Sequence, residues 1–370
     1  MVVIDESTRL LPDEQHCDAL DEEYTKYNLS LPKFPILVSL WLGSFLSSID
    51  STIVANIMNK VAEEFQESQE KQWIATSFLL TNTAFQPLYG KLSDITGRKF
   101  ALLTALSFFG LGCFLTSLST NIKQFAIARA ICGIGGGGIN AISSITVGDI
   151  CTAKDRGIYQ GYANIVFGMG QLLGAPVGGL FIATIGWRAL FWIQVPLVII
   201  AIILGEMYVN IKLVHVPPPS ERFKWKNISR IDFLGSFTLV SSITCFIILI
   251  STKSNVILLS LLSVLSFIAF IYVELYVSKD RILPFELLKG SFGCNSIATV
   301  ISSYVIFGEI FRSPIYLQLV QDFSVIKTGI FLIFPAITTA IGSLVTGAIL
   351  KRTKLDLAYC SYKLVLLGLC

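Results

Sequence analysis

Charged residues are scarce in this chain: Asp, Glu, Lys and Arg make up 14% of its 370 residues, whereas hydrophobic residues make up 53%. A water-soluble domain carries roughly 25% charged residues. The composition therefore excludes a water-soluble enzyme fold. It predicts an all-α membrane protein whose apolar helices cross the bilayer many times, because helices satisfy their own backbone hydrogen bonds in lipid.

Other features are also missing. Residues 1–33 are polar and acidic and show no signal peptide, so the first apolar run is expected to direct insertion. The eight cysteines contain no CxxC pair and no metal-ligand spacing, and most lie in apolar runs, which predicts small buried side chains and no metal or other cofactor. Histidine occurs only at His16 and His215, outside the apolar runs.

The apolar runs predict about ten complete transmembrane helices plus a partial eleventh, with boundaries uncertain by a few residues. The predicted spans are 35–57, 72–92, 100–119, 124–148, 158–183, 189–211, 232–252, 255–277, 293–319 and 326–350. The last apolar run, 356–370, is shorter than the roughly 20 residues that cross a bilayer. We interpret it as a span that is cut off part-way, so the chain looks truncated at its C-terminus.

Lysine and arginine concentrate in alternate loops, which predicts a cytosolic N-terminus by the positive-inside rule. The loop after the sixth span is polar and holds three consecutive prolines, as expected of a linker between two helical bundles. The predicted organisation is a cytosolic N-terminal tail (1–34), a first six-helix bundle (35–211), a cytosolic linker (212–231), two extra central helices (232–277) and an incomplete second bundle (278–370).

The loop between the second and third spans carries the most specific motif. It reads Gly90-x-Leu92-x-Asp94-x-x-Gly97-Arg98-Lys99. This pattern resembles the signature loop of the major facilitator superfamily, in the same topological place. The resemblance implies a major facilitator helical bundle, in which the loop glycines allow close helix approach. It also implies that Asp94 and Arg98 take part in a charge network that holds the two halves of the protein together in one state.

Three further motifs resemble the proton-coupled antiporters of that family. They are Ile49–Val54 around Asp50, Arg129–Gly138 with its four consecutive glycines, and Gly170–Gly179 with Gly174, Pro176 and Gly178. The last departs from the family pattern by one residue, because Ala175 separates Gly174 from Pro176. The fourteen-span branch is the nearest match, and within it Gln194–Pro196 and Arg312–Gln318 look most like the fungal vacuolar basic amino-acid transporters. The resemblance covers about residues 35–354.

Charged residues inside a bilayer are costly and mark functional positions by default. Asp50 lies in an otherwise uncharged run and can take a proton, accept a cation or pair with a base. Arg129 is expected either to tune the proton affinity of a neighbouring carboxylate or to snorkel to the headgroups. Glu309 either pairs locally with Arg312 or meets a cationic cargo. Glu206 and Glu274 fall near cytosolic span ends, where interfacial solvation is expected.

Taken with the resemblance, these residues imply a proton-coupled secondary transporter, an antiporter that moves basic amino acids into the vacuole. The chain has no GxxxxGK[ST] nucleotide-binding loop, so we expect a proton gradient to drive it and no enzymatic activity. The implied substrate and proton site is Asp50, Arg129 and Glu309. The residues implied in conformational coupling are Gly90, Asp94, Gly97, Arg98, Lys99, Gly170, Gly174, Pro176 and Gly178.

Two alternatives stay open at this point: a multidrug or siderophore antiporter at the plasma membrane, and a truncated product that does not transport. The expected partners are the lipid bilayer and a small cationic solute such as lysine, arginine or histidine, with no nucleic acid. In the N-terminal tail, Glu6 precedes Leu10 and Leu11 with the spacing of an acidic dileucine sorting signal. That spacing predicts an adaptor complex as a further partner and a vacuolar membrane location.

Overall fold

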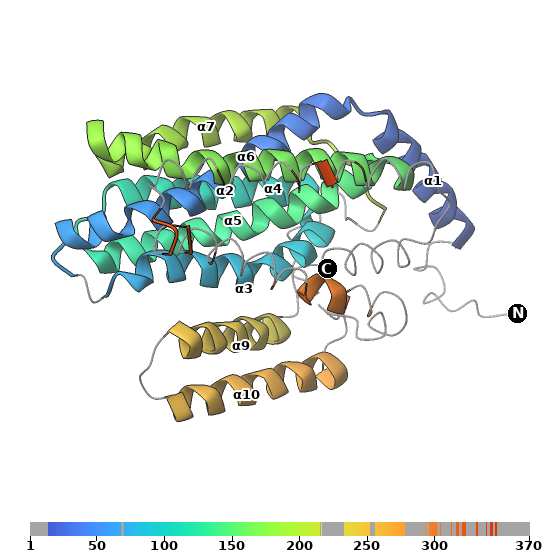
Figure 1. Cartoon of the computed structure of the whole chain (residues 1–370). Helices are drawn as coiled ribbons and strands as arrows, with labels where there is room; N and C mark the ends of the chain where they lie inside the picture. The colour runs from blue at the N-terminus through green and yellow to red at the C-terminus, as the bar shows by residue number, and fades with distance from the viewer. Residues whose placement is uncertain are drawn as a thin grey trace, which may run out of the picture.

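Nine long helices account for most of the residues that the computed structural model describes, which are 14–67, 70–214, 216, 233–251, 256–277, 293, 296–301 and isolated positions from 304 to 345. Six of them form one bundle (Figure 1). The bundle helices are α2 (Lys33–Glu64), α3 (Gln72–Thr96), α4 (Arg98–Ser117), α5 (Ile122–Ile150), α6 (Ala153–Thr184) and α7 (Trp187–Tyr208).

The short connections between these helices are set by residues suited to helix ends. Gly97 joins α3 to α4 at φ 91°, and Gly186 precedes α7 at φ 99°, a left-handed region that glycine adopts without strain. Asn121 and Thr152 cap α5 and α6 by accepting hydrogen bonds from the backbone N–H groups of Gln124 and Asp155. These turns reverse the direction of the chain, so successive helices run antiparallel.

Within the bundle, α5 packs against both α3 and α4, and α2 packs against both α6 and α7. Two apolar clusters form the core. One gathers residues such as Leu40, Leu106 and Ile139, and the other, further along α2, gathers residues such as Ile57 and Phe125. Asp50 on α2 and Arg129 on α5 fall between the two clusters along their helices, so a polar layer interrupts an otherwise apolar core.

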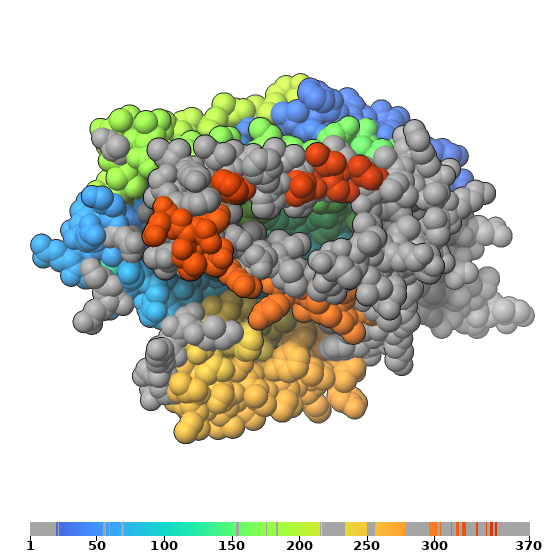
Figure 2. Space-filling model, viewed as in Figure 1, coloured from blue at the N-terminus to red at the C-terminus, as the bar shows by residue number. Residues whose placement is uncertain are grey.

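The remaining described helices lie outside this bundle. Helices α9 (Phe233–Ser251) and α10 (Val256–Tyr272) run side by side, and α9 packs against α3 (Figure 1). In the space-filling view they form a lobe of their own, coloured gold and orange (Figure 2). Helix α10 continues into a short π-helix, η3 (Val273–Val277). These helices lie at the positions of the seventh and eighth predicted spans, 232–252 and 255–277.

The observed helices confirm the positions of the first eight predicted spans to within a few residues at most ends, but some are longer. Helix α2 has 32 residues and is about 48 Å long, so it is longer than the roughly 30 Å thickness of the hydrocarbon core. Six helices in the described part of the chain are long and apolar enough to cross a membrane, and Leu234–Leu249 is a shorter apolar helix. The predicted spans at 293–319 and 326–350, and the partial one at 356–370, lie largely outside the described residues.

The N-terminal tail contains a helix that the sequence analysis did not predict. Helix α1 (Glu14–Ser30) precedes α2 and docks on the chain just after α7. Asn28 donates from Nδ2 to the carbonyl of Lys212 (2.7 Å) and accepts from its N–H (3.0 Å). The Lys212 ammonium also sits 4.4 Å from the centre of the Tyr27 ring. These contacts tie α1 to the start of the predicted linker, just after α7.

Candidate functional site

The centre of the candidate site is an ion pair in the middle of the bundle. Arg129 Nη1 lies 2.7 Å from Asp50 Oδ2, and both side chains are 0% exposed. The geometry excludes the snorkelling interpretation of Arg129. A buried charge is costly unless it is paired, so each of these residues depends on the other.

The surroundings of the pair are aromatic on one side and leave polar atoms without partners. The Arg129 guanidinium lies 4.5 Å from the centre of the Phe78 ring and 5.9 Å from that of Phe191. No described residue donates a hydrogen bond to Asp50 Oδ1, and none offers the Arg129 nitrogens an acceptor at a hydrogen-bonding angle, although Nη1 is close enough to Oδ2 for an ion pair. The pair is therefore held by charge and by ring faces, and it retains unused capacity to bind a ligand or a proton.

Two cysteines and a glutamine adjoin this pair. Cys113 Sγ on α4 lies 3.7 Å from Cys132 Sγ on α5 and 3.7 Å from Gln194 Oε1 on α7. Cys132 Sγ in turn lies 3.9 Å from Asp50 Oδ2. All four side chains are buried, so four helices contribute to one continuous polar layer. Cys113, Cys132 and Cys151 are buried free thiols, as expected, whereas Cys245, also a free thiol, is only half-buried.

The signature loop forms a second charge cluster at one end of the bundle. Arg98 Nη1 lies 2.6 Å from Asp94 Oδ1, and Arg98 Nε lies 2.7 Å from Asp149 Oδ2 on α5. Arg98 also donates to the Ser93 hydroxyl (2.6 Å). Sequence reasoning missed Asp149. It follows the predicted fourth span directly, and a carboxylate at a span end beside a basic loop was the available signal.

Lys99 contacts α7 and the residues just after it. Its Nζ lies 2.9 Å from Glu206 Oε1 and 3.2 Å from Asn210 Oδ1. The Glu206 side chain is 59% exposed, which agrees with the interfacial solvation expected for it. All described partners of Arg98 and Lys99 thus lie inside the first six-helix bundle.

Glycines on α6 let it lie close to α2, immediately beside Asp50. A Cβ at Gly170 would lie 1.9 Å from Ser48 Oγ, and a Cβ at Gly174 would lie 1.8 Å from Thr52 Oγ1. Gly178 is in ordinary contact with Ile53, and Pro176 lies within the uninterrupted helix α6. The small residues therefore do bring the two helices together at two of the three predicted glycines.

Among the described residues, a Cβ at Gly90 would meet nothing within 4 Å, so no described neighbour requires glycine at this position. The expectation for Glu274 is wrong, because its side chain is 0% exposed rather than solvated at an interface. Glu274 lies in the π-helix η3, whose wider turn shifts the face that this residue presents relative to the face that a continued α-helix would present. Glu309 and the Glu6, Leu10 and Leu11 motif lie outside the described residues.

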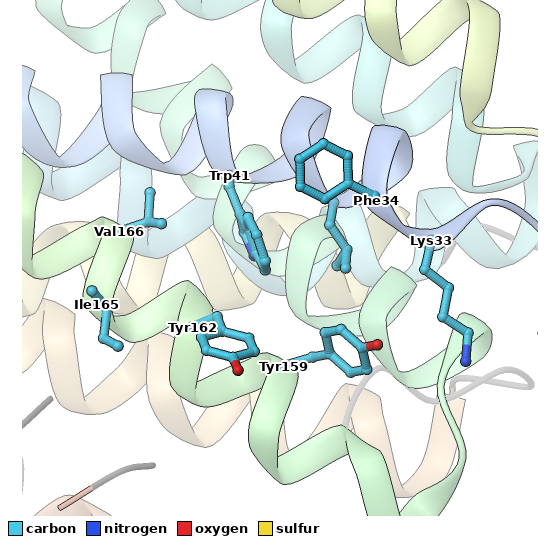
Figure 3. A pocket seen from close by; sticks show the side chains of 8 residues that line it. Lys33, Phe34, Trp41, Tyr159, Tyr162, Ile165 and Val166 are labelled. Carbon is cyan, nitrogen blue, oxygen red and sulfur yellow. The ribbon is translucent and has the colours of Figure 1, made fainter. Parts of the chain in front are cut away.

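An open apolar pocket of about 400 Å³ lies between α2 and α6, away from the ion pair (Figure 3). Trp41 on α2 faces Tyr159 and Tyr162 on α6, and Lys33 and Phe34 lie at one end (Figure 3). The rings of Trp41 and Tyr162 meet edge to face at 6.1 Å. Sequence reasoning missed this pocket, because its aromatic residues come from two helices and form no local motif.

At the far end of α2, a third charge contact joins α2 to α7. Arg188 Nη1 lies 2.5 Å from Glu64 Oε1, and Trp187 Nε1 donates to Glu64 Oε2 (2.6 Å). The hydrogen bond from Arg188 is the main cause that lowers the pKa of the Glu64 carboxyl below its ordinary range. Both side chains of the ion pair are more than 40% exposed, so solvent weakens this contact.

A six-helix bundle with a buried ion pair at its centre and a charged loop at one end has the architecture of a facilitator-type membrane protein. The sequence matches the Major Facilitator Superfamily over residues 40–369, and the chain belongs to that family. Its fold is similar to that of a proton:xylose symporter, XylE, whose structure was solved bound to 6-bromo-6-deoxy-D-glucose. The TM-score is 0.56 at 16% identity, over 89% of this chain and 69% of the other.

Two curated relatives are more similar in sequence. Vacuolar basic amino acid transporter 1 of Saccharomyces cerevisiae is 64% identical over 100% of this chain and 66% of its own length. Multidrug resistance protein fnx1 of Schizosaccharomyces pombe is 36% identical over 89% of this chain and 62% of its own length. The chain therefore spans a little under two thirds of the length of these relatives, and both are transporters by name rather than enzymes.

Proposed function

We propose that this protein is a proton-coupled antiporter that moves basic amino acids into the vacuole and belongs to the fourteen-span branch of its family. The identity of 64% along the whole chain with a relative named as a vacuolar basic amino acid transporter carries the proposal. The cargo would be a small cationic solute such as lysine, arginine or histidine, and a proton gradient would be the only driving force, with no cofactor.

The buried pair supplies the chemistry for this coupling. Asp50 is the one carboxylate fully buried in the polar layer between α2, α4, α5 and α7, among the described residues. When a cationic cargo displaces a proton from Asp50, that proton leaves the dry layer, so the total charge of the layer stays constant and no buried charge is left unpaired. Glu309 is proposed to contact the side chain of the cargo, and Arg129 its carboxylate.

Conformational coupling is proposed for the loop cluster and the α2–α6 contact. Gly90, Asp94, Gly97, Arg98 and Lys99 would control how the first bundle meets the second at the cytosolic side, with the N-terminus in the cytosol. Gly170, Gly174, Pro176 and Gly178 would let α6 move along α2 while Asp50 changes its partner. The close contacts of Gly170 with Ser48 and of Gly174 with Thr52 support this assignment.

The test is uptake of radiolabelled lysine by vesicles that contain the purified chain, with the inside acidified. We expect wild type to accumulate lysine and the double variant D50N/R129Q to lose proton-driven accumulation. This double variant replaces the charged pair by two amides, so it leaves no unpaired charge to unfold the bundle. E22Q, which makes the same carboxylate-to-amide change on the exposed side chain of Glu22, is the matched control and should accumulate lysine normally.

Unchanged proton-driven uptake by a folded D50N/R129Q variant would contradict the role of Asp50. Absence of uptake by wild type under every gradient would contradict the transport proposal itself. Both proteins should be checked for a single elution peak and a cooperative melting transition before assay.

A second function, drug export at the plasma membrane, is supported by the 36% identity with the relative named for multidrug resistance. Localisation separates the two. The dileucine motif at Glu6, Leu10 and Leu11 is proposed to bind a cytosolic adaptor complex, so L10A/L11A should divert a vacuolar protein to the plasma membrane. A wild-type protein already at the plasma membrane, unaffected by these changes, would favour drug export.

A further inference from the structure

Cys113 and Cys132 lie on different helices, yet their sulfur atoms face each other at 3.7 Å in the centre of the bundle. Helices α4 and α5 are in direct backbone contact here, because a Cβ at Gly112 would lie 2.4 Å from the Cα of Cys132. This close approach holds the two thiols in register. Neither thiol has a role in the proposed transport cycle.

The spacing matches a tetrahedral metal site. Two thiolates bound to one zinc ion at about 2.3 Å are about 3.8 Å apart, close to the observed sulfur separation. A zinc-bound sulfur and carboxylate oxygen are about 3.5 Å apart. Cys132 Sγ lies 3.9 Å from Asp50 Oδ2, and Cys113 Sγ lies 3.7 Å from Gln194 Oε1. The ligand atoms of Asp50, Cys113 and Cys132 all lie within 4.8 Å of one another.

An independent observation points to a ligand at the same place. Asp50 is 0% exposed, and its Oδ1 accepts no hydrogen bond from any described residue. Because Oδ2 faces both Arg129 and Cys132, the carboxylate would rotate so that one oxygen stays beside Arg129 while the other binds the cation. A buried acceptor without a partner is costly, and a metal–oxygen bond would remove that cost.

The charges also balance, despite the neighbouring arginine. When a divalent ion binds, each thiol S–H bond breaks, each sulfur lone pair forms a metal–sulfur bond, and the two protons go to water. No atom changes oxidation state. The metal with two thiolates is neutral, and so is Asp50 with Arg129, which suits a dry interior.

We infer that Cys113, Cys132 and Asp50, with Gln194 beside them, form a binding site for a thiophilic divalent cation of the zinc class. Two thiolates favour Zn²⁺ or Cd²⁺ over Mg²⁺ or Ca²⁺, which prefer oxygen ligands only. The ligands are enclosed, so the helices must separate for the ion to enter, and binding should be slow. Such an ion would join α2, α4 and α5.

The probe is Cd²⁺, whose bonds to thiolate give an ultraviolet charge-transfer band. The protein is the full chain in detergent and reductant, with the other six cysteines changed to serine, namely Cys17, Cys151, Cys245, Cys294, Cys360 and Cys370. We expect one Cd²⁺ per chain, with the intensity of two thiolates, and loss of the band when Zn²⁺ is added. The matched variants carry C113S or C132S in addition, and each should bind Cd²⁺ more than ~100-fold more weakly. A loss of that size exceeds the 10–100-fold loss expected when a residue only supports a metal ligand.

Absence of the band in the folded two-cysteine protein, or equal binding after C113S or C132S, would overturn the site. A melting transition within the wild-type range shows that each serine variant is folded. A consequence for activity rests on the proposed function: Cd²⁺ should slow lysine accumulation by wild type and not by C132S, each relative to its own uptake without metal. If no variant transports, the transport proposal fails, while the binding result decides the metal site independently.

Discussion

Two arginine–aspartate contacts in the same bundle have nearly equal lengths but different surroundings. Arg129 lies 2.7 Å from Asp50 with both side chains fully buried. Arg98 lies 2.6 Å from Asp94 and 2.7 Å from Asp149, whose side chains are 47% and 21% exposed. Because water and salt screen only the second cluster, equal distances correspond to different energies. Replacing one residue of the buried pair leaves an unpaired charge, so both must be replaced together. In the loop cluster, the charged side chains can exchange partners at little cost in free energy.

The largest effect should come from separating the buried pair. D50N leaves the Arg129 cation in a dry interior, and loss of one partner of a buried pair costs about 3–5 kcal/mol. The thermal transition of the purified protein in detergent should fall steeply, and D50L/R129M should recover most of the loss because two apolar side chains leave no unpaired charge.

E22Q is the control for this series and should melt with wild type. A D50N protein as stable as wild type would show that Arg129 finds another counter-charge or that water reaches it, and the contrast between the two clusters would disappear.

An intermediate effect is expected within the loop cluster. D149N removes the less exposed partner of Arg98 and should cost about 1 kcal/mol, whereas D94N should cost only a few tenths. Both values are small because Arg98 keeps one carboxylate in either variant. The melting transitions of the two variants, compared in one detergent, test this order. A larger loss for D94N would mean that burial does not rank these contacts.

The smallest effect concerns Glu64, which pairs with Arg188 in the most exposed of the three contacts. The pKa of Glu64 is lowered in the folded protein, so its stabilisation is present above the unfolded value, about 4.3, and is lost as the pH falls through the folded pKa. At pH 7 the free energy of unfolding of wild type should exceed that of E64Q by a few tenths of a kcal/mol. The difference should vanish once Glu64 is protonated in both the folded and the unfolded state. A difference between the melting transitions that grew on acidification would contradict this sign.

The fold was largely predictable because apolar runs between charged loops leave few choices in a bilayer. The helices near 72–92 and 100–119, and the tight turn at Gly97, follow from local composition alone. Helix α1 was not predicted as a docked element. The position of α1 depends on the hydrogen bond between Asn28 and the backbone of Lys212. No periodic pattern in residues 14–30 predicts a contact with a residue 184 positions away.

The sequence predicted individual residues of the candidate site, but it did not predict how they contact one another. Asp50 and Arg129 each stand out as a charge inside an apolar run, yet the sequence left open whether they meet. Asp149, the cysteine pair and the pocket beside Trp41 were missed, since each depends on which faces of two helices pack together. The role of Glu309 stays a prediction.

By itself, the sequence determined that this chain forms apolar helices, where they turn and which charges lie within them, because the cost of exposing polar groups to lipid acts on each segment separately. Only the tertiary structure decided that Asp50 faces Arg129, that Arg98 bonds to Asp149, and that two cysteines 19 residues apart touch. These contacts depend on the rotation and closeness of packed helices, which glycines such as Gly112 and Gly170 permit but do not direct.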